Sequence, residues 1–84
     1  MRSDMNIYRY TFACDCIVDG ETIDYQLEIK THGQLMVEDI IEFVEDQRDA
    51  TIQEVIADQL HAKFGGEQTI TGIHSNVTII THRH

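Results

Sequence analysis

The sequence predicts an α+β fold: a two-layer sandwich in which two helices lie on one face of an antiparallel sheet of three to four strands. Three observations predict this class. Residues 8–30 alternate apolar and polar side chains about a central Asp-Gly, residues 35–64 change to helical spacing, and residues 67–84 are rich in threonine and isoleucine. The predicted order is therefore β-β-α-α-β, with one further β if the last segment folds back on itself.

The first predicted element is a β-hairpin that runs from Tyr8 to Lys30 and turns at Asp19-Gly20. Asp-Gly between alternating segments favours a type I′ turn, because both residues tolerate a positive φ. A turn of two residues sets four cross-strand pairs whose side chains all share one face. These pairs are Cys16 with Ile23, Cys14 with Tyr25, Phe12 with Leu27, and Tyr10 with Ile29.

A first helix is predicted from about Leu35 to Gln47, because Met36, Val37, Ile40, Ile41 and Val44 recur at helical spacing and form an apolar stripe expected to face the core. A second is predicted from Ile52 to about Phe64. Thr51-Ile-Gln-Glu54 matches a capping box, in which the Thr51 hydroxyl accepts a hydrogen bond from the Glu54 amide. Gly65-Gly66 suits the end of this helix, since glycine takes the left-handed conformation without strain.

The segment from Glu67 to His84 is predicted to be extended, but its isoleucines do not share one face. Ile70 and Ile73 are out of phase in a strand. Either Gly72 marks a bulge in one long strand, or Ser75-Asn76 turns a second hairpin. The hairpin is the favoured interpretation.

Length and charge restrict the class of protein. The chain of 84 residues is predicted to be a single domain, 1–84, with residues 1–5 as a loose N-terminal extension. Its formal net charge of −9 argues against binding to bare nucleic acid or to an anionic membrane, whose phosphates would repel it. The two cysteines are too few for a disulfide framework, and no targeting segment or membrane span is recognisable. We therefore expect a soluble cytoplasmic protein.

Acidic residues along the two predicted helices are the leading candidate for a partner-binding surface. They are Glu38, Asp39, Glu42, Glu45, Asp46, Asp49, Glu54 and Asp58. Several lie four residues apart, where like charges destabilise a helix by about 0.2–0.5 kcal/mol per pair. A row of carboxylates roughly imitates a phosphate backbone and suits a groove lined with lysine and arginine. The alternative is a solvated face that only keeps a small protein soluble.

In charge and length, the chain resembles the very acidic accessory proteins of phages that block host defence or nucleic-acid-binding enzymes. The resemblance implies a non-enzymatic inhibitor that mimics nucleic acid. Such a protein would occupy the nucleic-acid site of a basic protein partner and would need no cofactor.

A second class of function is a small metal-binding or enzymatic domain. Cys14 and Cys16 could bind zinc together with two of the histidines, which are His32, His61, His74, His82 and His84. One residue between the cysteines is fewer than zinc sites use, so both thiols are expected to pack in the core. Asp15 and Asp24 are expected to face each other across the hairpin, where paired carboxylates suit acid–base or cation chemistry if they are buried. Near a turn we expect them to be solvated, and we expect no catalytic residue and no bound metal.

A third alternative is a homodimeric structural subunit. Ile7 and Tyr8 open the first strand, and Ile73 or Ile80 must lie on the sheet face opposite the helices. Exposed apolar residues at a strand edge favour the pairing of two copies.

Overall fold

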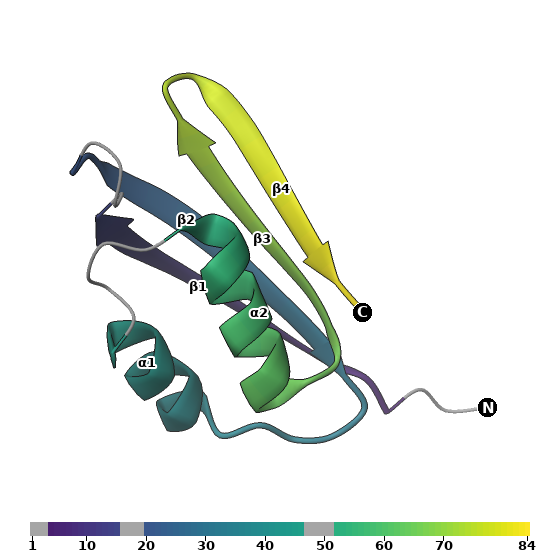
Figure 1. Ribbon diagram of the computed structural model, residues 1–84. Coiled ribbons are helices and arrows are strands. Elements are labelled where there is room, and N and C mark those ends of the chain that lie inside the picture. Colours follow the sequence, from purple (N-terminus) through teal and green to yellow (C-terminus); the bar gives the residue numbers. More distant parts are fainter. Residues whose placement is uncertain (1–3, 16–19, 47–51) are drawn as a thin grey trace.

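The computed structural model describes residues 4–15, 20–46 and 52–84, which form one four-stranded antiparallel sheet and two helices (Figure 1). The elements in chain order are β1 (Asn6–Asp15), β2 (Thr22–Thr31), α1 (Val37–Asp46), α2 (Gln53–Phe64), β3 (Glu67–His74) and β4 (Val77–Arg83). The strands lie side by side in the order β1-β2-β3-β4. The α+β class and the predicted succession of elements are confirmed.

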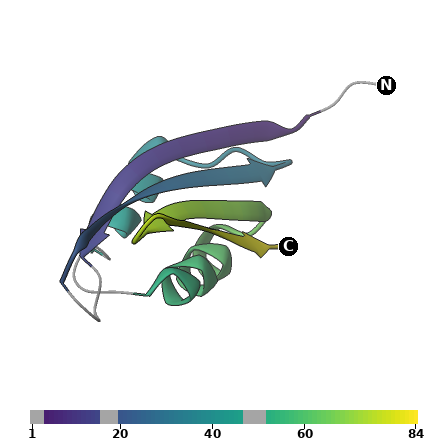
Figure 2. The same cartoon turned by 90° about the horizontal axis from the view of Figure 1, so that it is seen from above.

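The sheet is strongly curved (Figure 2), and the two helices pack on one face of it. In Figure 1, α2 crosses in front of the sheet, and α1 lies beside it toward the β1 edge. The buried core is formed between the layers by Phe12, Cys14, Ile23, Tyr25, Leu27, Ile29, Ile40, Val44, Ile56, Ala57, Leu60 and Ile70. In the part of the chain that the structure describes, neither helix is long and apolar enough to cross a membrane.

The inward face of the first hairpin is as predicted, but the predicted register is wrong by two residues. Cys14 pairs with Ile23 and Phe12 with Tyr25, and the last described pair is Asp15 with Thr22. Cys16 and Asp19 of the predicted arrangement lie outside the described residues. A slip of two residues leaves every side chain on its own face, so alternation alone does not distinguish the two registers.

Both helices start later than predicted. α1 begins at Val37, and the preceding Leu35 is held by its N–H, which donates to the Tyr8 hydroxyl at 2.9 Å. α2 begins at Gln53 with Ile52 in the N-cap position, one residue beyond the predicted cap, and no side chain of the described residues caps this end. Thr51 itself lies outside the described residues.

The end of α2 is at the predicted glycines. Gly65 has φ 68° and ψ −158°, and its N–H donates to the His61 carbonyl at 2.9 Å. This backbone conformation is not the left-handed helical one that was expected, but a neighbouring region that is essentially open to glycine alone. The chain is thereby turned back into β3.

The last segment forms the second hairpin, which was the favoured of the two interpretations. Ser75 and Asn76 have φ values of 50° and 67°, as a two-residue type I′ turn requires, and His74 pairs with Val77. Gly72 is not a bulge. It lies opposite Tyr25 in a regular ladder.

Two buried glutamines join α2 to the sheet. Gln53, at the start of the helix, donates from Nε2 to the carbonyl oxygens of Ile70 and Ile79 at 3.0 and 2.9 Å. Gln68, at the start of β3, donates from Nε2 to the carbonyls of Leu60 and Gly65 at 3.0 and 2.8 Å. Hydrogen bonds donated by two buried side-chain amides thus hold both ends of α2 against the sheet.

Candidate functional site

The carboxylates of α1 form one acidic surface. Ile40 and Val44 point into the core, and every acidic residue of the helix is exposed. With 3.6 residues per turn, Glu38, Glu42 and Glu45 fall on the side opposite the core. Asp39 and Asp46 lie to one side of Glu42, and these three carboxylates line a shallow hollow with Lys63 of α2. We call these five carboxylates (Glu38, Asp39, Glu42, Glu45 and Asp46) the acidic face; α1 contains no basic residue.

Most carboxylates of the acidic face have no ion-pair partner among the described residues. Among the described residues, Glu38, Asp39, Glu42 and Asp46 form no ion pair within 4.0 Å of a lysine, arginine or histidine. Lys63 borders the same hollow without reaching that distance. These four carboxylates therefore present their charge to solvent.

Glu54 and Asp58, the two predicted site residues on α2, do not join this face. Asp58 of α2 accepts a hydrogen bond from Arg83 Nε at 2.8 Å, which turns it toward β4 and away from α1. Glu54 lines a hollow between the start of α2 and β4. Asp49 lies outside the described residues. The structure thus brings together five of the eight predicted residues.

An apolar groove runs beside the acidic face, between α1 and the edge strand β1. It has a volume of about 230 Å³, and Ile7, Val37 and Ile41 are among the residues that line it. Ile7 and Val37 are about half exposed, at 51% and 53%. Sequence reasoning assigned Val37 and Ile41 to the core stripe, although that stripe is wider than the sheet covers. This excess width was the signal that could have identified the groove.

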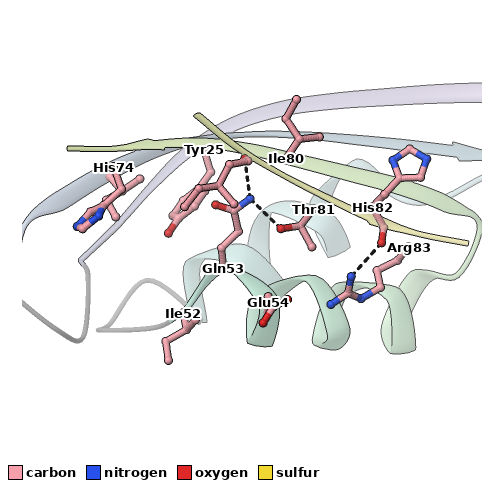
Figure 3. Close-up of a pocket in the computed structure, with 11 residues that line it drawn as sticks. Tyr25, Ile52, Gln53, Glu54, His74, Ile80, Thr81, His82 and Arg83 are labelled. Carbon is pink, nitrogen blue, oxygen red and sulfur yellow. Dashed lines mark hydrogen bonds between the residues drawn. The ribbon is translucent and has the colours of Figure 1, made fainter. Parts of the chain in front are cut away.

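A larger hollow of about 530 Å³ opens between the start of α2 and the edge strand β4 (Figure 3). Its walls are mainly apolar and include Ile23, Ile52 and Ile79. Behind them, the Gln53 side-chain amide donates a hydrogen bond to the carbonyl of Ile79 in the sheet. Figure 3 shows Ile80 and His82 pointing away from α2, whereas Arg83 points toward it. The hollow is suited to an apolar group, and sequence reasoning did not predict it.

The two constellations considered for enzymatic or metal chemistry have different outcomes, since Cys14 packs in the core as expected and the two aspartates do not pair. Cys14 is 2% exposed and packs in the core, and it belongs to no cluster of metal-ligand side chains among the described residues. Cys16 lies outside them. The predicted pairing of Asp15 with Asp24 is wrong. With the register shifted by two, Asp24 faces Ala13, and Asp15 accepts a hydrogen bond from the Thr22 hydroxyl at 3.0 Å.

Comparisons with protein-family models, with curated proteins and with solved structures found no match to this chain.

Proposed function

We propose that this protein is a non-enzymatic interaction protein whose acidic face binds a basic protein partner. The observation that supports the proposal is the concentration of five exposed carboxylates on a helix of ten residues with no basic side chain. The partner we favour is a nucleic-acid-handling protein, because a surface that binds phosphates through lysine and arginine also suits a row of carboxylates.

Repulsion within α1 favours such a partner. Glu42 lies four residues from both Glu38 and Asp46, and each like-charged pair at this spacing costs about 0.2–0.5 kcal/mol. A cationic groove would relieve this repulsion on binding. The same field would accelerate association at low ionic strength, since exposed charges act over about 10 Å at 0.1 M salt.

The experiment is capture of partners from a lysate of the native host with two matched triple variants. One reverses the acidic face with Glu38→Lys, Glu42→Lys and Glu45→Lys. The control makes the same change of net charge on the β1–β2 hairpin, at the exposed Asp15, Glu21 and Asp24. The proposal expects a basic protein that wild type and the control retain, that the first variant loses, and that nucleic acid displaces. Equal retention by both variants, or binding unchanged at 1 M salt, would contradict it.

A second candidate function, a homodimeric structural subunit, is favoured by the edge strand β4. Ile80 on the open face of the sheet is 64% exposed, and Val77 and Ile79 on the helix-bearing face are 60% and 42% exposed. Both faces of this edge are therefore apolar next to unpaired backbone groups, an arrangement that suits pairing with a second β4.

Light scattering tests the dimer. A second copy paired through β4 would double the mass of the particle, and Ile80→Lys would return it to the monomer. Ile7→Lys is the matched control, because Ile7 is a comparably exposed residue on the opposite edge strand, β1. A monomer at all concentrations up to hundreds of micromolar would exclude this function.

A further inference from the structure

Three metal-ligand side chains lie together at the end of the β3–β4 hairpin, opposite its turn. They are Glu67, His82 and His84, and one ligand atom of each lies within 4.8 Å of the other two. His84 Nδ1 lies 3.4 Å from Glu67 Oε1, and the two imidazole rings have centroids 4.7 Å apart at 67°. All three side chains are exposed and open to a cation from solvent.

The strand geometry explains why these residues meet. His82 and His84 lie two positions apart, so their side chains project from the same face of the sheet. Gln68 pairs with Arg83, which brings the neighbouring Glu67 next to His84. Arg83, between the two histidines, points to the other face and donates to Asp58, so its positive charge is directed away from the cluster (Figure 3).

A fourth residue orients one of the imidazoles. Thr69 Oγ1 lies 2.7 Å from His82 Nδ1 on the open face of the sheet. When Nδ1–H donates to this hydroxyl, Nε2 carries the free lone pair and becomes the ligand atom. Metal-binding histidines typically have such a partner on the second ring nitrogen, which sets the tautomer and the ring orientation.

We propose that Glu67, His82 and His84 form a binding site for a divalent transition metal of the Zn²⁺ class. Two imidazoles and one carboxylate are a ligand set that Zn²⁺ uses, with a fourth position left for water or for another ligand. Tetrahedral bonds of about 2.0–2.2 Å need ligand atoms about 3.4 Å apart, so the exposed side chains have to close slightly around the ion. The site lies on the open face of the sheet and is independent of the proposed role of the acidic face.

The test is titration of Zn²⁺ alone into the protein without an affinity tag, followed by calorimetry. We expect one ion per chain, and we expect His82→Ala and His84→Ala each to weaken binding by at least tenfold. Thr69→Val should weaken it by about 10–100-fold, the range typical of lost partners of ligating histidines. His61→Ala on α2 and His32→Ala after β2 are matched controls that should leave the affinity unchanged.

Two further measurements exclude other sources of binding. Cys14→Ser should retain the affinity, and the imidazole resonances that shift in NMR spectra on addition of Zn²⁺ should be those of His82 and His84. Circular dichroism verifies the fold of each variant. Substitution of the exposed His32, His82 and His84 should not disturb it, whereas Cys14→Ser changes a buried side chain, so its affinity is compared only if the spectrum is that of the wild type. The proposal is overturned if Zn²⁺ does not bind at millimolar concentration, if binding survives either histidine substitution, or if it depends on Cys14.

Discussion

Gly72 is a residue whose missing side chain shapes the interface between α2 and the sheet. A Cβ at this position would come within 2.7 Å of the Tyr25 ring and 2.8 Å of Gln53 Oε1. Because both neighbours are buried, Gly72→Ala should force them apart and lower the free energy of unfolding by about 1–3 kcal/mol. Urea denaturation followed by circular dichroism measures this difference.

Gly33→Ala is the control for this substitution. No atom lies within 4 Å of its added Cβ, and its φ is not positive, so the free energy of unfolding should change by no more than about 0.5 kcal/mol. If the two substitutions had equal effects, the close packing around Gly72 would not be the cause.

The ion pair between Arg9 and Glu28 makes part of the stability depend on pH. Arg9 Nε donates to Glu28 Oε2 at 2.8 Å, and this hydrogen bond, with the positive charges of Arg9 and Lys30, lowers the pKa of Glu28 below its usual 4.5 although partial desolvation opposes it. A lowered pKa stabilises the folded state above the unfolded-state pKa, and this contribution is lost as the pH falls through the folded-state value.

Arg9→Gln should therefore lower the free energy of unfolding at pH 7 by at most about 1 kcal/mol, since Arg9 is largely exposed. The difference from wild type should vanish as the pH is lowered from 4.5 through the folded-state pKa of Glu28. Urea unfolding at a series of pH values measures it. A difference that persists unchanged in acid would contradict the assignment to this ion pair.

The burial of Gln53 and Gln68 could not be predicted from the sequence. Sequence patterns assign glutamine to the surface, and each of the two residues is next to a glutamate in the sequence. The acceptors of Gln53 are 17 to 28 residues away, so its burial depends on the packing of α2 against β3 and β4. Local periodicity carries no information about such contacts.

At the scale of elements, alternation and helical spacing predict type and orientation well. All described residues of the first hairpin lie on their predicted faces, and the described ends of the helices fall within about two residues of the predictions. The register of the hairpin was wrong because period-two alternation is unchanged by a slip of two residues. Asp19-Gly20 alone was an insufficient guide to where the strands end.

For the acidic face, too, the sequence predicts the exposed side of one element but not the contacts between elements. Helical spacing is enough to place five carboxylates on the exposed side of α1. It does not reveal that Asp58 of α2 turns toward Arg83, because that depends on where β4 lies relative to α2. The sequence therefore predicts which side chains a helix exposes, but not how that helix lies against a strand.

A substitution of Glu42 measures how much the like charges of the acidic face destabilise α1. Glu42→Gln removes like-charge repulsion with Glu38 and Asp46, two pairs at about 0.2–0.5 kcal/mol each, so the free energy of unfolding should rise by about 0.4–1 kcal/mol at low salt. Screening in 1 M salt should remove most of the gain. Denaturant unfolding at the two salt concentrations gives both values.

Asp24→Asn is the matched control, because Asp24 is exposed on the sheet and faces Ala13 rather than another charge. It should change stability little at either salt concentration. A similar gain from both substitutions would attribute the effect to net charge and not to the row along α1.

At the scale of the whole molecule, the two helices are held unequally. α2 buries four side chains and is hydrogen-bonded to the sheet by a glutamine near each end. α1 buries Ile40 and Val44 and carries the acidic face. Apolar grooves flank both helices, beside β1 and beside β4. The molecule thus combines a firmly packed half with a half that has less apolar burial and more repulsion.

Amide hydrogen exchange followed by NMR should expose this difference. Segments with little burial open locally at a lower free energy than the whole domain, so the interior amides of α1 should exchange at least tenfold faster than those of α2, β2 and β3. The two buried residues of α1 and its mutual repulsion are the physical reason. Equal protection of both helices would mean that α1 opens only when the whole domain unfolds. The acidic face would then be a rigid surface, and a basic partner would gain nothing from ordering it.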